Sequence, residues 1–205
     1  MSTKLTGALL GALLTFSGAG RGDTVRDPAM PAILPLKQRA AVMDQWLVHR
    51  LDTLLPSLMR AQDVDMWILI AREYNEDPVV ETMLPATWLS ARRRTILMFV
   101  DTGETVERMA VARYPVGDIF PKAWDPDAQP DQWARVRDIV AEHAPERIAL
   151  NISEDVALAS GLSHSQYAGL SAALPDYRDR FVSGERLAVG WLETRTAPEM
   201  ATYPT

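Results

Sequence analysis

The chain has 205 residues, of which 47% are hydrophobic and 23% charged, so its composition is that of an ordinary globular protein. Its net charge of −6, from 27 acidic and 21 basic residues, argues against a basic surface for nucleic acid. Cysteine is absent, which excludes disulfides, thiol nucleophiles, iron–sulfur clusters and cysteine zinc sites. The length predicts one domain, or one domain with extensions.

Residues 1–23 are predicted to be a signal peptide or leader. Lys4 precedes the apolar run Leu5–Phe16, and the small residues Ser17–Gly20 follow it, a pattern typical of secretory signal peptides. The run is too short to span a bilayer comfortably, so no stable membrane span is predicted. The pattern favours a periplasmic or secreted protein, and a cytoplasmic protein with an Ala/Gly-rich leader is the alternative.

A proline-rich linker, residues 24–36, is expected to precede the main domain, residues 37–195. The segment Lys37–Met59 carries apolar residues at spacings of three and four, which predicts an amphipathic helix. Pro56 is expected to kink this helix or to split off its last turn, because proline removes a backbone donor and clashes with the preceding turn.

Two short apolar runs, Met66–Ile70 and Thr95–Val100, predict strands that are covered on both faces. A polar loop is expected between them. Turn residues at Asp101–Glu104 separate the second strand from the alternating segment Val106–Val111, which predicts a hairpin.

The second half begins with Tyr114–Pro130, whose prolines predict a packed loop without regular structure. Further elements are then expected in this order: a helix with Trp133, Val136, Ile139 and Val140, a strand Ile148–Ile152, a helix with Tyr167, Leu170 and Leu174, an edge strand Tyr177–Val182, and a final helix capped by Ser183. This order predicts an α/β domain with a mixed sheet flanked by helices.

The chain ends on a helix-start signal, in which Thr196 is the expected N-cap, Pro198 lies in the first turn and Glu199 completes a capping box. Only six residues follow Glu199. We therefore expect residues 196–205 to begin a linker helix that leads to a domain this chain lacks.

Three stretches together resemble the amino-terminal domain of the creatinase, prolidase and aminopeptidase P family. LLPSLMRAQDVDMWILIAREYNEDP is similar to the family's opening helix, strand and polar loop; ARRRTILMFVD is similar to its next strand, and LETRTAPEM to its linker. The resemblance extends from about Lys37 to Glu199. The linker departs from the family pattern, because Thr196-Ala197 and a lone Glu199 stand where a Lys and paired acids are usual.

The resemblance implies a ribonuclease H-like layered domain that belongs to a dimeric, two-domain Xaa-Pro metallopeptidase. In that family, two divalent metal ions such as Mn, Co or Zn are bound in a carboxyl-terminal catalytic domain, whose motifs cannot be matched here, so no cofactor is expected in this chain. The implied partners are the catalytic domain, a second copy of the chain and proline-containing peptides. A stand-alone exported interaction or small-ligand-binding module of the same fold is the alternative.

Arg92, Arg93 and Arg94 form the densest positive charge, directly before a predicted strand. A guanidinium there could clamp a peptide carboxylate or pair with Glu73. The alternatives are a solvated start of a strand, or an internal salt bridge. Trp88 lies in a predicted loop and could line a substrate entrance or contact a partner. These five residues are the candidate site.

The three histidines, His49, His143 and His164, fall on separate predicted helices without carboxylates at chelating spacing. We therefore interpret them as structural. Ser163-His164-Ser165 lacks the glycine-rich elbow of serine hydrolases and is expected to be a capping segment.

Overall fold

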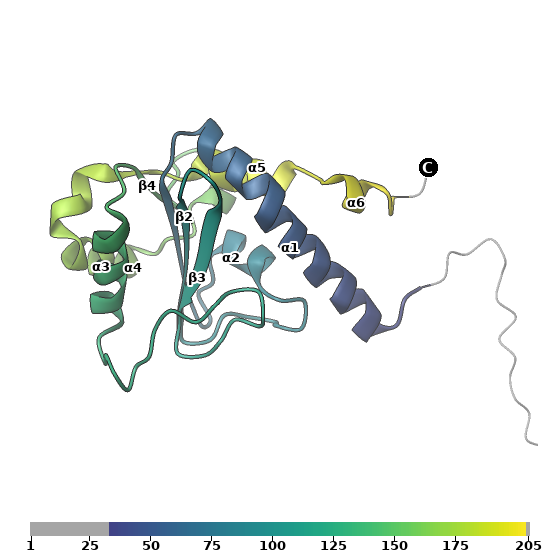
Figure 1. Ribbon diagram of the computed structural model, residues 1–205, viewed down its shortest axis with the longest axis horizontal. Coiled ribbons are helices and arrows are strands. Elements are labelled where there is room, and N and C mark those ends of the chain that lie inside the picture. The colour runs from purple at the N-terminus through teal and green to yellow at the C-terminus, as the bar shows by residue number, and fades with distance from the viewer. Residues whose placement is uncertain (1–32, 204–205) are drawn as a thin grey trace, which may run out of the picture. The chain divides into compact units, whose positions relative to one another are not determined.

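A five-stranded mixed sheet with helices on both faces forms the core of the protein (Figure 1), which confirms the predicted α/β class. The computed structural model describes residues 33–203. The predicted leader and residues 24–32 of the predicted linker therefore lie outside the described residues. The described residues from Leu34 onward form one compact unit.

The elements follow the predicted order, with one helix added. In chain order they are α1 (Leu36–Ala61), β1 (Met66–Arg72), α2 (Pro78–Met83), β2 (Arg94–Asp101), β3 (Val106–Val111), α3 (Gln132–His143), β4 (Ile148–Leu150), α4 (His164–Ala173), β5 (Phe181–Ser183), α5 (Glu185–Glu193) and α6 (Ala197–Met200), with 3-10 turns at Ala157–Ala159 and Pro175–Arg180.

The strands lie in the order β3-β2-β1-β4-β5. The hairpin β2–β3 is antiparallel, as the sequence predicts, and β2 also pairs antiparallel with β1. On the other side of β1, the pairs β1–β4 and β4–β5 are both parallel. Only β2 therefore runs against the direction of the other four strands.

Two layers of helices cover the sheet (Figure 1): α1, α2 and α5 lie on one face, the α1 face, and α3 and α4 on the other, the α3 face. Side chains alternate between the faces because successive residues of a strand point in opposite directions. Trp67 and Leu69 of β1 accordingly pack on the α1 face, and Met66 and Ile68 on the α3 face.

Helix α1 continues through Pro56 to Ala61, so of the two predicted effects of Pro56, a kink or a split-off last turn, the split is wrong. Proline deprives the carbonyl of Asp52 of its helical donor, but Asp52 is exposed, so this carbonyl can be hydrated. Meanwhile Leu55 and Met59 are buried on the same stripe of the helix. Their packing extends on both sides of the proline and holds the last turn in place.

Helix α2 replaces part of the polar loop that we expected between β1 and β2. The Asp77 carboxylate accepts hydrogen bonds from the N–H groups of Val79 (2.8 Å) and Val80 (3.3 Å). Pro78 occupies the first helical position, where its missing N–H costs nothing. Asp-Pro was therefore a helix-start signal within a segment interpreted as loop.

Two predictions near the last strand need correction. Tyr177–Arg180 belongs to a 3-10 turn, so β5 begins only at Phe181, although it is the edge strand as expected. Gly184, not Ser183, is the N-cap residue of α5. The Ser183 hydroxyl still accepts a hydrogen bond from the Glu185 N–H at 3.2 Å, which is the contribution expected of a capping serine.

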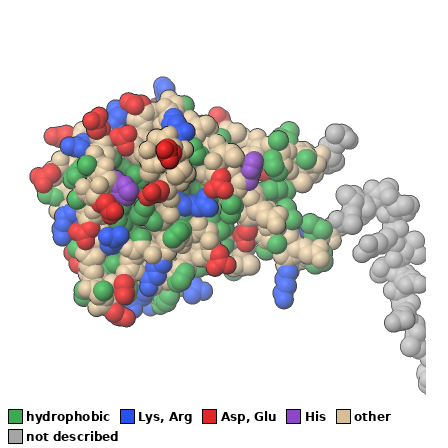
Figure 2. Space-filling model, viewed as in Figure 1, with side chains coloured by type: hydrophobic (Ala, Val, Ile, Leu, Met, Phe, Trp, Pro, Cys, Tyr) green, Lys and Arg blue, Asp and Glu red, His purple; other side chains and the backbone are tan. Residues whose placement is uncertain are grey.

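The segment Tyr114–Pro130 contains no helix and no named strand, as predicted, and it packs Phe120 and Trp124 into the protein. Basic and acidic side chains are intermixed over the face shown in Figure 2. No helix in the described part of the chain is long and apolar enough to cross a membrane.

Candidate functional site

The five predicted site residues lie at one end of the sheet, but they divide between two recesses. Trp88 and Arg92 line a cavity of about 420 Å³ together with Thr87, Leu89 and Ser90, which we term the Trp88 recess. The Arg92 guanidinium lies 5.3 Å from the centre of the Trp88 ring and 5.8 Å from that of Tyr114. These distances allow cation–π contacts with both rings.

Arg93 and Glu73 meet mainly through the backbone. The Arg93 N–H donates to Glu73 Oε2 (3.2 Å), and the Glu73 N–H donates to the Arg93 carbonyl (2.7 Å). Arg93 Nε lies 4.0 Å from Glu73 Oε2, and the arginine side chain is 75% exposed. Of the two roles considered for Arg93, the pairing with Glu73 is the contact present in the structure.

The Arg94 side chain lies apart from those of Arg92 and Arg93. It is half-buried on the α3 face, where its Nε donates to Gln132 Oε1 (2.7 Å) and its guanidinium lies 4.2 Å from the centre of the Trp133 ring. Burial, followed by the charge of Arg72, lowers the pKa of Arg94, although Asp131 opposes the shift. Arg94 and Arg93 line a second cavity of about 760 Å³.

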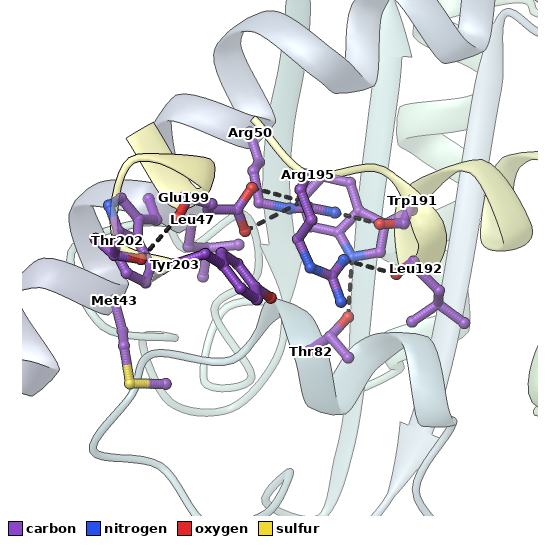
Figure 3. Close-up of a pocket in the computed structure, with 11 residues that line it drawn as sticks. Met43, Leu47, Arg50, Thr82, Trp191, Leu192, Arg195, Glu199, Thr202 and Tyr203 are labelled. Carbon is purple, nitrogen blue, oxygen red and sulfur yellow. Dashed lines mark hydrogen bonds and ion pairs between the residues drawn. The ribbon is translucent and has the colours of Figure 1, made fainter. Parts of the chain in front are cut away.

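A third cavity, of about 640 Å³, lies between α1, α5 and the segment of α6 (Figure 3). The buried Arg50 side chain of α1 donates to the carbonyls of Thr194 (2.6 Å) and Trp191, and it pairs with Glu199 at 3.1 Å. Its guanidinium also lies 4.3 Å from the centre of the Trp191 ring. One arginine therefore ties α1 to the end of α5 and to α6.

The predicted capping box at Thr196 is present. Glu199 Oε2 accepts hydrogen bonds from the Thr196 N–H (2.6 Å) and Oγ1 (2.8 Å). Burial of the Glu199 carboxylate acts to raise its pKa, but the hydrogen bonds from Thr196 and the charge of Arg50 outweigh it, so the pKa lies below its usual value. No local sequence signal indicates the pairing with Arg50, which is 149 residues away.

A buried polar chain on the α1 face was also missed. Trp67 Nε1 donates to Asn151 Oδ1 (3.0 Å), and Asn151 Nδ2 donates to the Asp77 carboxylate (2.9 Å). Burial raises the pKa of Asp77, against the hydrogen bonds that it accepts from Asn151, Val79 and Val80. The chain links β1, the end of β4 and the start of α2, and all of its side-chain groups are used within the fold.

The histidines lie on three separate helices, as predicted: His49 in α1, His143 in the last turn of α3 and His164 at the start of α4. Between residues 33 and 203, no group of three His, Asp or Glu side chains is placed to hold a metal ion. Ser163 occupies the N-cap position of α4, but its hydroxyl makes no capping hydrogen bond.

Comparison with known proteins gives no relative: no family model, no curated protein and no solved structure matches this chain.

Proposed function

We propose that residues 37–195 are the non-catalytic amino-terminal domain of an Xaa-Pro aminopeptidase-like metallopeptidase. This domain shapes the substrate entrance of the enzyme and contributes to a homodimer. Its metal-binding hydrolase half, with two divalent ions, is not contained in this chain. The sequence resemblance supplies the family, and the arrangement of the strands supports it.

The observation that carries the proposal is the sheet order β3-β2-β1-β4-β5 with β2 alone antiparallel to the rest. This order and these directions agree with a ribonuclease H-like fold, the layered fold that the resemblance implies. Helix α1 precedes the sheet in the chain and packs on it, which agrees with the helix-then-strand opening of the family.

The Trp88 recess supports a role at a substrate entrance. Leu89 beside it is 98% exposed, and Arg92 is exposed between two aromatic rings. An exposed guanidinium flanked by aromatic rings suits a peptide that carries a carboxylate and an apolar side chain. On this proposal, Trp88 and Arg92 contact the peptide, whereas Arg93 is retained by Glu73.

The cavity of Figure 3 supports a linker role for the end of the chain. Arg50 and Trp191 fix the direction in which residues 194–199 leave the domain. A fixed exit direction is what a gating domain needs, because its position relative to a catalytic domain depends on the linker between them.

The proposal is tested by extending the reading frame of the encoding gene beyond Thr205 and assaying both products. The 205-residue chain should release no residue from an Xaa-Pro tripeptide with Mn²⁺ present, and it should be a dimer by light scattering. The extended product should be active and carry Asp, His and Glu metal ligands. A chelator-sensitive activity of the 205-residue chain would contradict the proposal.

A stand-alone ligand-binding or interaction module is the second candidate. The observation that favours it is that the described residues from Leu34 onward form one compact unit with a core on each face of the sheet. A stop codon directly after Thr205 in independent isolates would support this candidate, because the chain would then function without a hydrolase half.

A further inference from the structure

Three arginines lie in a row across β1, β2 and the end of β3, on the α3 face. Arg72 ends β1 and Arg94 begins β2, and the two are directly opposite in the antiparallel register. Val111, the last residue of β3, pairs with Ile96. Arg113 follows two residues later, in a bend beyond the paired residues, and all three arginines line the cavity of about 760 Å³.

Like charges directly opposite on neighbouring strands destabilise a sheet. Among the described residues, none of these three arginines forms an ion pair with a carboxylate. The nearest acidic groups are already used: Glu73 contacts Arg93, and Asp131 accepts the Trp133 N–H at the start of α3. Glu73 also lines the cavity and the charge of Asp131 acts on Arg94, but within residues 33–203 neither carboxylate forms an ion pair with Arg72, Arg94 or Arg113.

Two glutamines from the covering helices differ in how they are bonded. Gln132 is buried and fully engaged, since it accepts from Arg94 Nε and donates to the carbonyls of Arg94 (3.0 Å) and Val111 (2.7 Å). Gln166 is only 5% exposed, yet its Oε1 has no hydrogen-bond partner among the described residues. A buried amide oxygen without a partner is costly and requires an explanation.

Gln132 also orients the Arg94 guanidinium, so that its terminal nitrogens are available to a ligand. It holds the guanidinium by Nε while Trp133 packs against its plane, and no partner within the described residues takes the terminal nitrogens of Arg94. Gln132 is the first residue of α3 and Gln166 the third residue of α4. The positive ends of both helix dipoles therefore add to the positive potential of the cavity.

We propose that this cavity binds a small organic oxyanion with at least two negative charges. Arg72, Arg94 and Arg113 bind its phosphate or carboxylate oxygens, and the Gln166 side chain lines the same cavity. The aromatic residues Tyr74, Tyr114 and Trp124 line the cavity as well, together with Glu73 and Arg93, and they face the ligand's uncharged part. The proposal does not rest on the proposed function, because none of Arg72, Arg94 and Arg113 lines the Trp88 recess, although Tyr114 lies beside both cavities.

The direct test is isothermal titration calorimetry of the full chain with inorganic phosphate and, separately, with citrate, at constant ionic strength. Saturable binding of either supports the proposal, and the tighter of the two identifies the phosphate or the carboxylate class. Arg72→Gln and Arg113→Gln should each weaken binding at least about tenfold, because each removes a charge-assisted hydrogen bond. Arg72 and Arg113 are both exposed, so these variants should fold.

The matched control is Arg39→Gln, an exposed arginine of α1, the helix on the other face of the sheet. Its affinity should equal that of the unaltered chain. Absence of binding by both probes would overturn the proposal. An equal loss of affinity in Arg39→Gln and Arg72→Gln would also overturn it, since the attraction would then come from overall charge rather than from a site.

A second variant, Gln166→Glu, tests the charge of the cavity. It places a negative charge on a residue that lines the cavity beside the three arginines. We expect at least about tenfold weaker binding of phosphate and citrate, because the ligand would meet a like charge. Unchanged affinity in this variant would contradict a binding site in this cavity.

Discussion

The two faces of the sheet differ in whether all of their buried polar side-chain atoms have hydrogen-bond partners. On the α1 face, the indole of Trp67, the amide of Asn151 and the carboxylate of Asp77 bond to one another. On the α3 face, α4 carries both of the buried side-chain atoms that lack a partner within residues 33–203, Gln166 Oε1 and Ser171 Oγ. The polar chain of the first face is complete, whereas the second face combines the fully bonded Gln132 with two buried polar atoms of α4 that lack a partner in that range.

The charges show the same contrast. Arg50, buried on the α1 face, is surrounded by two carbonyls and a carboxylate. Arg72, Arg94 and Arg113 on the α3 face have one another as neighbours and no ion pair in the described part of the chain. Since an unpaired cationic row opposes folding, its presence points to binding rather than to stability.

The largest effect is expected from Trp67→Ala on the α1 face. Trp67 is fully buried, its ring centre lies 5.9 Å from that of Phe99 in a tilted arrangement, and its indole donates to Asn151. Its loss should lower the free energy of unfolding by about 3–5 kcal/mol, as urea denaturation would measure. Trp88→Ala, in the exposed recess, is the control and should cost less than about 1.5 kcal/mol. An equal loss of unfolding free energy in Trp67→Ala and Trp88→Ala would contradict the distinction between the buried core and the exposed recess.

Asp77→Ala should be the next most destabilising. It removes the cap of α2 and leaves Asn151 Nδ2 buried without an acceptor, so we expect a loss of about 2–4 kcal/mol. Asp131→Ala provides a comparison, because Asp131 is an exposed N-cap of α3 that accepts only the Trp133 N–H. Asp131→Ala should lower the free energy of unfolding by about 1 kcal/mol. A smaller loss for Asp77→Ala than for Asp131→Ala would show that the buried chain contributes little.

Glu199→Gln should lower the free energy of unfolding by about 1–2 kcal/mol at pH 7, because Arg50 loses its charged partner. The effect depends on pH in a defined direction. The pKa of Glu199 is lower in the folded protein, so its contribution is complete above the unfolded value of about 4.3 and is lost as the pH falls below it. Denaturation curves of the two proteins should therefore converge as the pH falls through the lowered pKa of folded Glu199; a constant difference would exclude the ion pair as its source.

Gln166→Met should leave stability unchanged or raise it by up to about 1 kcal/mol, since it removes a buried polar group that has no partner among the described residues. Asn151→Ala is the matched amide on the α1 face, and it should cost about 2–3 kcal/mol. Calorimetric melting of both variants makes the comparison. A loss for Gln166→Met as large as that for Asn151→Ala would mean that the two faces do not differ.

The smallest effect is expected from Arg93→Ala. Its side chain is largely exposed, and its contacts with Glu73 are mostly made by the backbone, which the variant retains. The free energy of unfolding should change by less than about 0.5 kcal/mol. A large fall in melting temperature would show that the Arg93 guanidinium is structurally paired.

The sequence predicted the elements whose signals are local. Helix α1, the hairpin β2–β3 and the capping box at Thr196 depend on spacing within a few residues, and the structure has all three. Helix α2 was missed because the polar residues before Asp77 dominated the interpretation of a short segment, although Asp77-Pro78 is itself a start signal.

The cavity on the α3 face could be predicted only in part. Arg94 was a candidate, but Arg72 and Arg113 become its neighbours through strand register, which no local pattern encodes. One signal was available: each of the three arginines lies two residues from an inward-facing aliphatic residue, Ile70, Ile96 or Val111, and so on the same face. Gln166 Oε1 is buried without a partner among the described residues because of how α4 packs on the sheet, and no sequence signal indicates this.

The most direct test is the shift in melting temperature that phosphate or citrate causes in the unaltered full chain and in the double variant Arg72→Gln/Arg113→Gln. At about ten times the dissociation constant, a ligand that binds only the folded state should raise the melting temperature of the unaltered chain by about 3–6 °C. The double variant should show no shift, while its melting temperature without ligand stays equal or rises. An equal shift in both proteins, or none in either, would contradict the claim that the α3 face is built to bind an oxyanion.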